Sequence, residues 1–298
     1  MRAHFYRTSR TFTFCLAGLL GLGITLASVE SDAQKPADKK DGKPAAPAAP
    51  AAPAAADVKP IVAKLKANDE AQIKDGLDEA RLAGPRASAA APVVAEVLQR
   101  GLSLPLTQTA IETLGDLESD TGSAALAQYT HHRNAKVRRS AVKALTRTKG
   151  AAAAPALKRA LSDADAVVRG TAASGLGSLK AKDAVPELFI ALDHRVNEAA
   201  ASIGQLCLVD QCEQLAAKLG KLPFDVVTGG LDQVLFRPAA EINDDAKVKI
   251  IGRIREQGTI EGNKFLKEVQ KRATAAGLSA RVRQAIDQAV MATAGGAQ

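Results

Sequence analysis

The chain has 298 residues, of which 46% are hydrophobic, only 3% are aromatic and none is Trp. This composition allows a sizeable core of small aliphatic side chains, and it argues against a base-stacking surface for nucleic acid. The formal net charge of +8 favours an acidic or anionic partner. Apolar and polar residues nowhere alternate over a strand-length window between turn signals, so we expect an all-α protein.

The first 33 residues have the layout of a secretory signal peptide. Three arginines precede a continuous apolar run at residues 12–26, which is followed by small and polar residues. The run holds about fifteen residues, fewer than the roughly twenty needed to cross a bilayer, so we expect cleavage between Ala33 and Gln34. The mature chain would then be periplasmic or secreted, without a transmembrane helix. A membrane tether formed by an uncleaved signal is the alternative.

Residues 34–57 form a tract of Lys, Pro and Ala that contains no side chain large and apolar enough to pack in a core. We expect this tract to be a disordered linker that serves as a spacer. A repeat domain would occupy residues 58–290, and residues 291–298 would form a disordered tail.

A period of 31 residues runs through the middle of the chain. When residues 135–163 are aligned with residues 166–193, identical residues fall 31 positions apart. The same spacing separates Gly84 from Gly115. The matched pairs are Val137 and Val168, Arg138 and Arg169, Leu145 and Leu176, Pro155 and Pro186, and Leu157 and Leu188.

Each unit contains two apolar stripes at helical spacing, separated by a short polar turn, which predicts a helix-turn-helix hairpin. Neither helix of a hairpin can bury its apolar face alone, so successive hairpins must stack into an α-solenoid of about six to seven repeats. The pattern weakens in the C-terminal half. Residues 223–241 are expected to form an irregular insert, and a degenerate hairpin would begin at Asp245.

The repeated residues resemble the HEAT-like repeats of the phycobilisome-lyase type, with V-R, then A-x-x-A/G-L, a turn and A-x-P-x-L. The resemblance covers about residues 60–290 and implies a superhelix in which Pro opens the second helix of each hairpin. The fold hosts binding modules and a few enzymes, so the resemblance fixes no activity. It also implies that a repeated Arg and nearby acids bridge adjacent units as a ladder, and the residues in those positions are Arg138, Asp163, Asp165 and Arg169.

Motifs that carry catalysis or metal binding are absent from the sequence. There is no nucleophile elbow and no phosphate-binding loop, and no His is followed by Glu as in the HEAT-repeat enzymes that hold a di-iron centre. His131 and His132 are expected to face a helix C-terminus, with a metal-ligand role as the alternative. Gly229 and Gly230 are best interpreted as a turn. We therefore assign no catalytic, metal-binding or cofactor-binding residue and expect no cofactor.

Cys207 and Cys212 are expected to form a structural disulfide, because export exposes a chain to an oxidising compartment. A continuous helix would place two side chains five positions apart about 140° from each other, so the helix must break between them. The repeat predicts that break, with Asp210 able to cap the second helix. A free pair or a redox-active pair is the alternative.

A run of cations without acidic neighbours in sequence distinguishes the third repeat. Residues 121–162 contain no Asp or Glu. A solvated basic face would explain this run, and so would a patch that binds an anionic or acidic partner. The candidate patch consists of Arg133, Lys136, Arg139, Lys143, Arg147, Lys149, Lys158 and Arg159.

Together these patterns predict a non-catalytic scaffold of the cell envelope. It would recognise a protein, or another envelope component, through its helical-repeat surface. A lyase-like enzyme or a cofactor-handling accessory protein of the same repeat class is the alternative.

Overall fold

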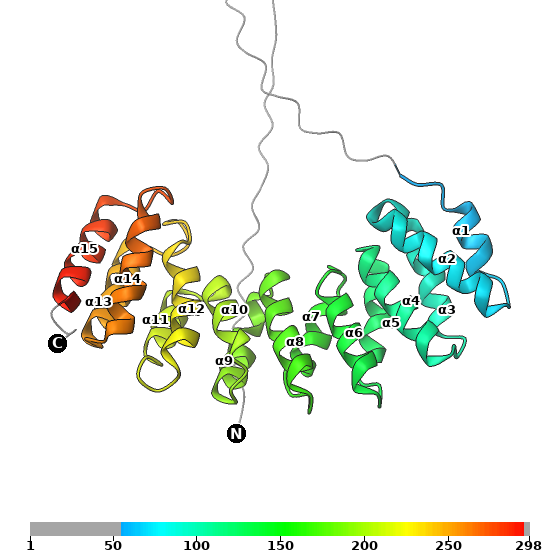
Figure 1. Cartoon of the computed structure of the whole chain (residues 1–298), viewed down its shortest axis with the longest axis horizontal. Helices are drawn as coiled ribbons and strands as arrows, with labels where there is room; N and C mark the ends of the chain where they lie inside the picture. The colour runs from blue at the N-terminus through cyan, green and yellow to red at the C-terminus, as the bar shows by residue number, and fades with distance from the viewer. Residues whose placement is uncertain (1–54, 295–298) are drawn as a thin grey trace, which may run out of the picture. The chain divides into compact units, whose positions relative to one another are not determined.

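The computed structural model describes residues 55–294, and all regular elements in this range are helical (Figure 1). The expected all-α solenoid is therefore confirmed. The predicted signal peptide, its cleavage point and residues 34–54 of the expected linker lie outside the described residues. The α-helices are α1 (Lys59–Leu65), α2 (Glu70–Ala83), α3 (Ala91–Leu98), α4 (Leu104–Asp116), α5 (Ser123–Tyr129), α6 (Ala135–Leu145), α7 (Ala153–Ala160), α8 (Ala166–Ser178), α9 (Val185–Asp193), α10 (Glu198–Leu206), α11 (Val209–Ala216), α12 (Phe224–Leu235), α13 (Asp244–Glu256), α14 (Ile260–Ala273) and α15 (Ala280–Ala294).

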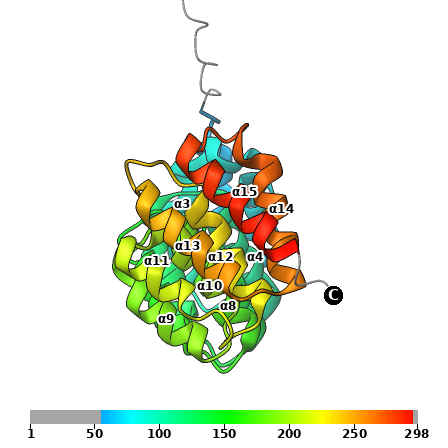
Figure 2. The ribbon, with the colours of Figure 1, turned by 90° about the vertical axis from the view of Figure 1, so that its left-hand side faces the viewer.

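Consecutive helices form hairpins that follow one another in chain order from α1 to α15, and Figure 2 looks along this row from the end that holds α15. The even-numbered helices from α2 to α12 form one layer, in which each helix packs against the next. The odd-numbered helices form the other layer, where α1 contacts α3, α5 contacts α7, and α11 contacts α13. Stacking of this kind buries the apolar face that a single hairpin would leave in water.

The positions matched by the 31-residue period form the core. Leu145 and Leu176 are fully buried in the first helices α6 and α8, and Leu157 and Leu188 are fully buried in the second helices α7 and α9. Identical residues therefore recur because each unit presents the same side chain to the same inter-helix space.

Polar side chains and prolines fix where the helices of the middle units begin. The Asn134 side chain accepts a hydrogen bond from the backbone N–H of Lys136, and the Asp165 carboxylate accepts two backbone N–H bonds at the start of α8. Pro186 is the second residue of α9, and Pro155 is the third residue of α7. Because the first four N–H groups of a helix have no intrahelical partner, proline costs nothing at these places.

Helices α10 and α12 approach each other so closely that only glycine fits between them. A Cβ atom added at Gly204 would lie 2.0 Å from the carbonyl oxygen of Gly230, and one added at Gly230 would lie 2.4 Å from the carbonyl oxygen of Ala200. Gly229, the neighbour of Gly230 in α12, has nothing within 4 Å of such a Cβ.

Three expectations for the C-terminal half were wrong. The irregular insert at 223–241 contains α12, a regular helix in which Gly229 and Gly230 lie mid-helix and form no turn. The degenerate hairpin expected from Asp245 is present as α13 and α14, and its first helix lies in the layer of α11 and α15. Residues 291–294 of the expected disordered tail belong to α15. In α12 the burial of Val227, Leu231 and Val234 at helical spacing overrides the low helix propensity of two glycines.

Candidate functional site

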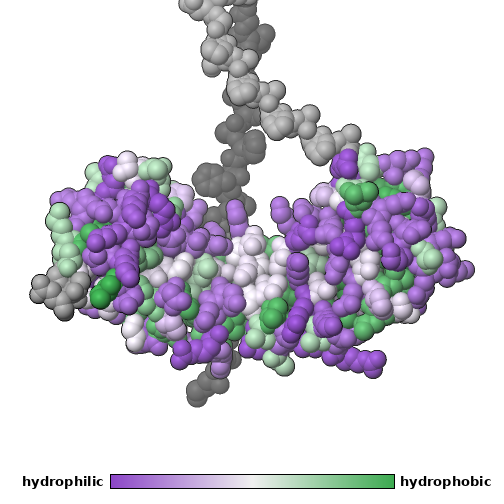
Figure 3. All heavy atoms as spheres, in the orientation of Figure 1, coloured by the Kyte–Doolittle hydropathy of each residue, from purple (hydrophilic) through white to green (hydrophobic). Residues whose placement is uncertain are grey.

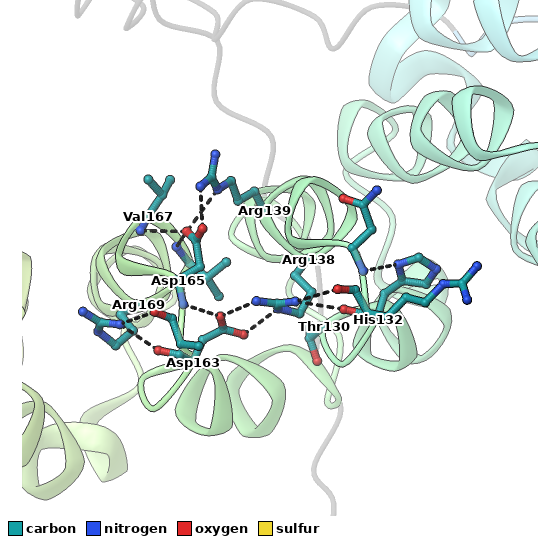
Figure 4. Close-up of polar contacts among 12 residues, drawn as sticks. Thr130, His132, Arg138, Arg139, Asp163, Asp165, Val167 and Arg169 are labelled. Atoms are coloured by element: carbon teal, nitrogen blue, oxygen red, sulfur yellow. Dashed lines mark hydrogen bonds and ion pairs between the residues drawn. The ribbon is translucent and has the colours of Figure 1, made fainter.

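The loop between α7 and α8 joins neighbouring units through Asp163. Arg138, in α6, grips the Asp163 carboxylate with two parallel hydrogen bonds, 2.8 Å from Nε to Oδ2 and 2.9 Å from Nη2 to Oδ1 (Figure 4). Its remaining nitrogen, Nη1, donates to the carbonyl oxygens of His132 and Arg133. The side chains of Arg138 and Asp163 are only 16% and 11% exposed. This bidentate pair is therefore shielded from water and stronger than an ordinary surface ion pair.

Asp165 makes a second connection two residues further along the same loop. It accepts hydrogen bonds from Nε and Nη2 of Arg139, the former at 3.0 Å, and it caps α8 through the N–H groups of Val167 and Val168 (Figure 4). The ladder expected from the repeat thus includes Arg139, a residue assigned from the sequence to the anionic-partner patch.

Both carboxylates are more acidic than an ordinary Asp. The hydrogen bonds from Arg139 are the main reason that the pKa of Asp165 falls to about 2. Burial alone would raise the pKa of Asp163, but the hydrogen bonds from Arg138 and from the backbone N–H of Asp165 outweigh burial, so this pKa is also lowered. Both side chains are therefore ionised at neutral pH.

Arg169 occupies in α8 the position that Arg138 has in α6, but its step of the ladder has no acid. Its Nη1 donates to the carbonyl oxygens of Asp163 and Ala164 at 2.8 and 3.0 Å, as Nη1 of Arg138 donates to two carbonyl oxygens one unit earlier. Asp163 lies 25 residues after Arg138, whereas the residue 25 positions after Arg169 is His194. Within residues 55–294, Nε and Nη2 of Arg169 form no hydrogen bond or ion pair. We call the step at Arg138 closed, because Asp163 occupies the Nε–Nη2 edge of the guanidinium. We call the step at Arg169 open, because no acid of the described chain occupies that edge.

A pocket of about 430 Å³ lies at this open step, between the second helices α7 and α9 and the turns that follow them. Arg169 and His194 supply polar groups to its wall. Leu161, Ile190 and Ala191 supply apolar surface, and Ile190 is 60% exposed. The pocket therefore combines an unengaged guanidinium edge with an apolar wall.

Lys158 and Glu187 form the opposite part of the pocket wall as an ion pair, with 2.8 Å between Nζ and Oε1. The hydrogen bond that Lys158 donates to Glu187 is the main reason that the pKa of Lys158 is raised. The other carboxylate oxygen of Glu187, Oε2, is buried and lacks a hydrogen-bond partner among the residues described. A buried acceptor without a donor is costly to stability.

The eight cations of the candidate patch divide into two groups. Arg139 pairs with Asp165, Lys158 pairs with Glu187, and Arg147 pairs with Asp116 and Glu118. These three side chains form ion pairs that connect the third repeat to the neighbouring units. The others, which form no ion pair within the described range, are Arg133, Lys136, Lys143, Lys149 and Arg159.

Cys207 and Cys212 are joined by a disulfide across the junction of α10 and α11. Helix α10 ends at Leu206 and α11 begins at Val209, so the helix breaks between the two cysteines. Asp210 does not cap α11. Instead, the Gln211 side chain accepts a hydrogen bond from the N–H of Leu208 at 2.9 Å. Both cysteines are buried, which suits a structural bond.

The two histidines after α5 take part in local contacts. Nδ1 of His132 accepts a hydrogen bond from the backbone N–H of Asn134 at 3.1 Å, and its ring stacks on Tyr129. Across residues 55–294, no group of three or more His, Cys, Asp or Glu side chains could hold a metal ion. None of the described helices is both long and apolar enough to span a membrane.

The stacked hairpins and the Arg/Asp ladder define an α-solenoid repeat protein. Residues 91–176 and 123–208 match the family model for HEAT repeats, so this part of the chain carries HEAT repeats. The resemblance drawn from the sequence is thus confirmed. No curated protein matches the chain.

Several solved structures are similar to the chain. The complex of CpcE and CpcF of phycocyanin lyase from a Nostoc species is 20% identical, with 84% of this chain and 100% of that chain covered and a TM-score of 0.42. An engineered protein is 17% identical, with 80% and 68% covered and a TM-score of 0.44. A designed armadillo repeat protein in complex with a (KR)4 peptide is 13% identical, with 80% and 100% covered and a TM-score of 0.41. The identification of HEAT repeats in residues 91–208 rests on the family-model match and not on these structures.

Ion pairs between units are the part of the site that a search for local acidic neighbours missed. Asp116, in α4, pairs with Arg81 of α2 and with Arg147 beyond α6, so one carboxylate links three units. Arg147 follows Asp116 by 31 residues, one full period. The spacing itself was the signal, because residues one period apart lie side by side in a stacked repeat.

Proposed function

We propose that this chain is a non-catalytic scaffold of the cell envelope that binds a protein partner through its helical-repeat surface. The observation that carries the proposal is the group of five third-repeat cations that form no ion pair in the described part of the chain, Arg133, Lys136, Lys143, Lys149 and Arg159. Charges without a partner inside the molecule are available to an acidic partner.

Several of the unpaired cations lie on α6 and the turn after it, which are connected by ion pairs to the next and the preceding unit. Lys136 and Lys143 are exposed on α6, two turns apart. The same helix is tied to the next unit by Arg138 and Arg139, while Arg147 ties the turn after it to the preceding unit. A surface that is fixed before binding loses little conformational entropy when a partner docks.

Hydropathy is unevenly distributed along the face in Figure 3. Hydrophilic residues cover this face toward both ends of the row, and residues of intermediate hydropathy cover its middle. Helix α8, in the middle, places exposed Ser174 and Ser178 one period after Lys143 and Arg147 of the preceding unit. A partner that spans several units would therefore meet a charged region beside an uncharged one.

A crosslinked pull-down tests this function. The wild-type mature chain should capture an envelope protein saturably, and the triple variant Lys136→Glu, Lys143→Glu, Lys149→Glu should lose most of this capture at low salt. Arg147 is left unchanged because its substitution would break the ion pair to Asp116. The wild-type capture should weaken as salt screens the exposed charges.

The matched control changes the same charge elsewhere, with Lys221→Glu, Lys264→Glu and Lys267→Glu on exposed positions that form no ion pair within residues 55–294. Capture by this control should equal that of the wild type. Equal losses in the two triple variants, or capture that does not saturate, would contradict a defined binding surface.

Export is a separate component of the proposal and has its own measurement. Mass spectrometry of the chain recovered from the envelope fraction of its native host should find Gln34 as the N-terminal residue. Recovery of the chain in the cytosol with residues 1–33 intact would contradict export.

A further inference from the structure

We infer that the open ladder step at Arg169 binds the carboxylate of an Asp or Glu side chain in an extended segment of the partner protein. This inference rests on the proposed binding function and deepens it, because it names the chemistry by which the partner is recognised.

The closed step one unit earlier shows what the open step can hold. Arg138 and Arg169 are one period apart, and each uses Nη1 to bind two backbone carbonyl oxygens of the turn before its helix. In Arg138 this anchoring directs Nε and Nη2 onto the Asp163 carboxylate. Arg169 is anchored in the same way, so its Nε–Nη2 edge presents the same two parallel donors to an incoming carboxylate.

His194 leaves the acceptor position of the open step without an internal carboxylate. It occurs one period after Asp163, is exposed, and lines the pocket with Arg169. Asp163 also lines this pocket, but its two oxygens already accept from Arg138 and from the N–H of Asp165. Glu187 is similarly held by Lys158. Neither acid can take the place that an Asp at position 194 would fill.

The surroundings favour a singly charged carboxylate over a phosphate. Asp163 and Glu187 both carry negative charge in the pocket wall, and like charge repels a dianion more than a monoanion. The planar two-oxygen face of a carboxylate also matches the guanidinium edge, as the Arg138 pair demonstrates in the same molecule.

One further feature indicates a peptide rather than a small acid. Ile190 and Leu161 offer an apolar wall beside the guanidinium, which suits a branched aliphatic side chain next to the acidic one. The expected ligand is therefore an acidic residue followed or preceded by an aliphatic residue.

A titration observed at Arg169 itself tests the inference. The mature chain, labelled with ¹⁵N-arginine, is titrated with the blocked peptide acetyl-Ala-Asp-Leu-Ala-amide, and the Nε–H signal of Arg169 is followed by NMR. This signal should shift saturably. The peptide acetyl-Ala-Asn-Leu-Ala-amide, which lacks the carboxylate, should bind about tenfold more weakly or not at all.

Two His→Asp substitutions distinguish a specific effect at the open step from a general effect of added negative charge on peptide binding. His194→Asp supplies the missing internal carboxylate and should weaken peptide binding about tenfold. His132→Asp makes the same change one period before Asp163, where the residue 25 positions earlier is Thr107 and offers no guanidinium. Asp at position 132 can still accept the N–H of Asn134, as Asp163 accepts that of Asp165. Peptide binding by this control should match the wild type.

The inference is overturned if the Asp and Asn peptides shift Arg169 equally, or if His194→Asp and His132→Asp bind the Asp peptide equally well. It is also overturned if the wild-type Arg169 signal is insensitive to peptide because the chain's own carboxylate already occupies the site. Should His194→Asp fail to fold, Arg169→Gln, read by a leucine methyl signal of Leu161, must abolish the titration. A failed titration beside persistent envelope capture would reject this inference alone, whereas a successful titration without saturable capture would reject only the proposed scaffold function.

Discussion

The middle units and the C-terminal units are held together by different physical means. Between α6 and α8 the contact is a polar ladder, in which Arg138 and Arg139 bind Asp163 and Asp165 of the next turn. Between α10 and α12 the two backbones meet directly, because Gly204 and Gly230 leave no room for a side chain, and Arg237 after α12 donates to the carbonyl oxygens of Gly204 and Cys207. The buried bidentate ion pair distinguishes the first contact, and the direct approach of two backbones distinguishes the second.

The boundary between the two regions is the step from α8 to α10. There the buried Ser202 hydroxyl donates to the carbonyl oxygen of Ala173 at 2.8 Å, and this contact joins the two helices. Arg169 is present in this step, and His194 stands at the position where the preceding unit has Asp163. The Ser202 hydrogen bond therefore joins α8 and α10 at the step where the ladder pair is missing.

The largest loss of stability is expected from a substitution that disrupts the packing of α10 on α12. Gly230→Ala places a Cβ atom 2.4 Å from the carbonyl oxygen of Ala200, and the resulting displacement of α12 should lower the free energy of unfolding by about 3 kcal/mol. Gly229→Ala, one residue earlier and facing open space, should raise that free energy by up to about 1 kcal/mol because alanine is the better helix former. Urea denaturation of both variants measures the difference. Similar values for the two would contradict close packing of α10 on α12.

The next largest loss of stability is expected from a substitution that removes the Arg138–Asp163 ion pair. Asp163→Ala removes the carboxylate bound by Arg138 and leaves a mostly buried guanidinium without its partner, so we expect a loss of about 2 kcal/mol in unfolding free energy. His194→Ala changes the corresponding position of the open step and should alter the unfolding free energy by less than about 0.5 kcal/mol. The same denaturation experiment checks both. A loss in His194→Ala as large as that in Asp163→Ala would show that the open step is closed by contacts of its own.

A smaller effect appears only as a function of pH. Because the pKa of Asp165 is about 2 when folded and near 4 when unfolded, its ion pair contributes fully to stability above about pH 4. As the pH falls from about 4 to 2, protonation removes this contribution. The difference in unfolding free energy between the wild type and Asp165→Asn should therefore be constant from pH 7 to about pH 4 and shrink below it. A difference that does not change down to pH 2 would contradict the lowered pKa.

Much of the fold could be predicted from the sequence because the residues that recur with the period are buried core residues. Leu145 and Leu176, or Leu157 and Leu188, recur with the period because they fill equivalent spaces in the core. The period fails in α12, where Gly229 and Gly230 look like a turn when read locally. Their helical state depends on packing against α10, which no local pattern encodes.

The candidate site was only half predictable. The arginines and acids of the ladder were visible as repeated positions, but the pairing of Arg139 with Asp165 depends on which face of α6 meets the next turn. The open step could have been read from the period, since His194 stands where an Asp is expected. The pocket beside it requires Ile190 and Glu187 of α9 to lie against Arg169 of α8, a relation that only the stacked structure reveals.

The most direct measurement of the central claim is a double-mutant cycle between positions 169 and 194. His194→Asp should raise the unfolding free energy by about 1 kcal/mol in the wild-type background, because the new carboxylate meets the Nε–Nη2 edge of Arg169. In the Arg169→Gln background the same substitution should give no gain. A coupling of about 1 kcal/mol is the predicted result, and an equal effect of His194→Asp in both backgrounds would contradict an open, carboxylate-binding step.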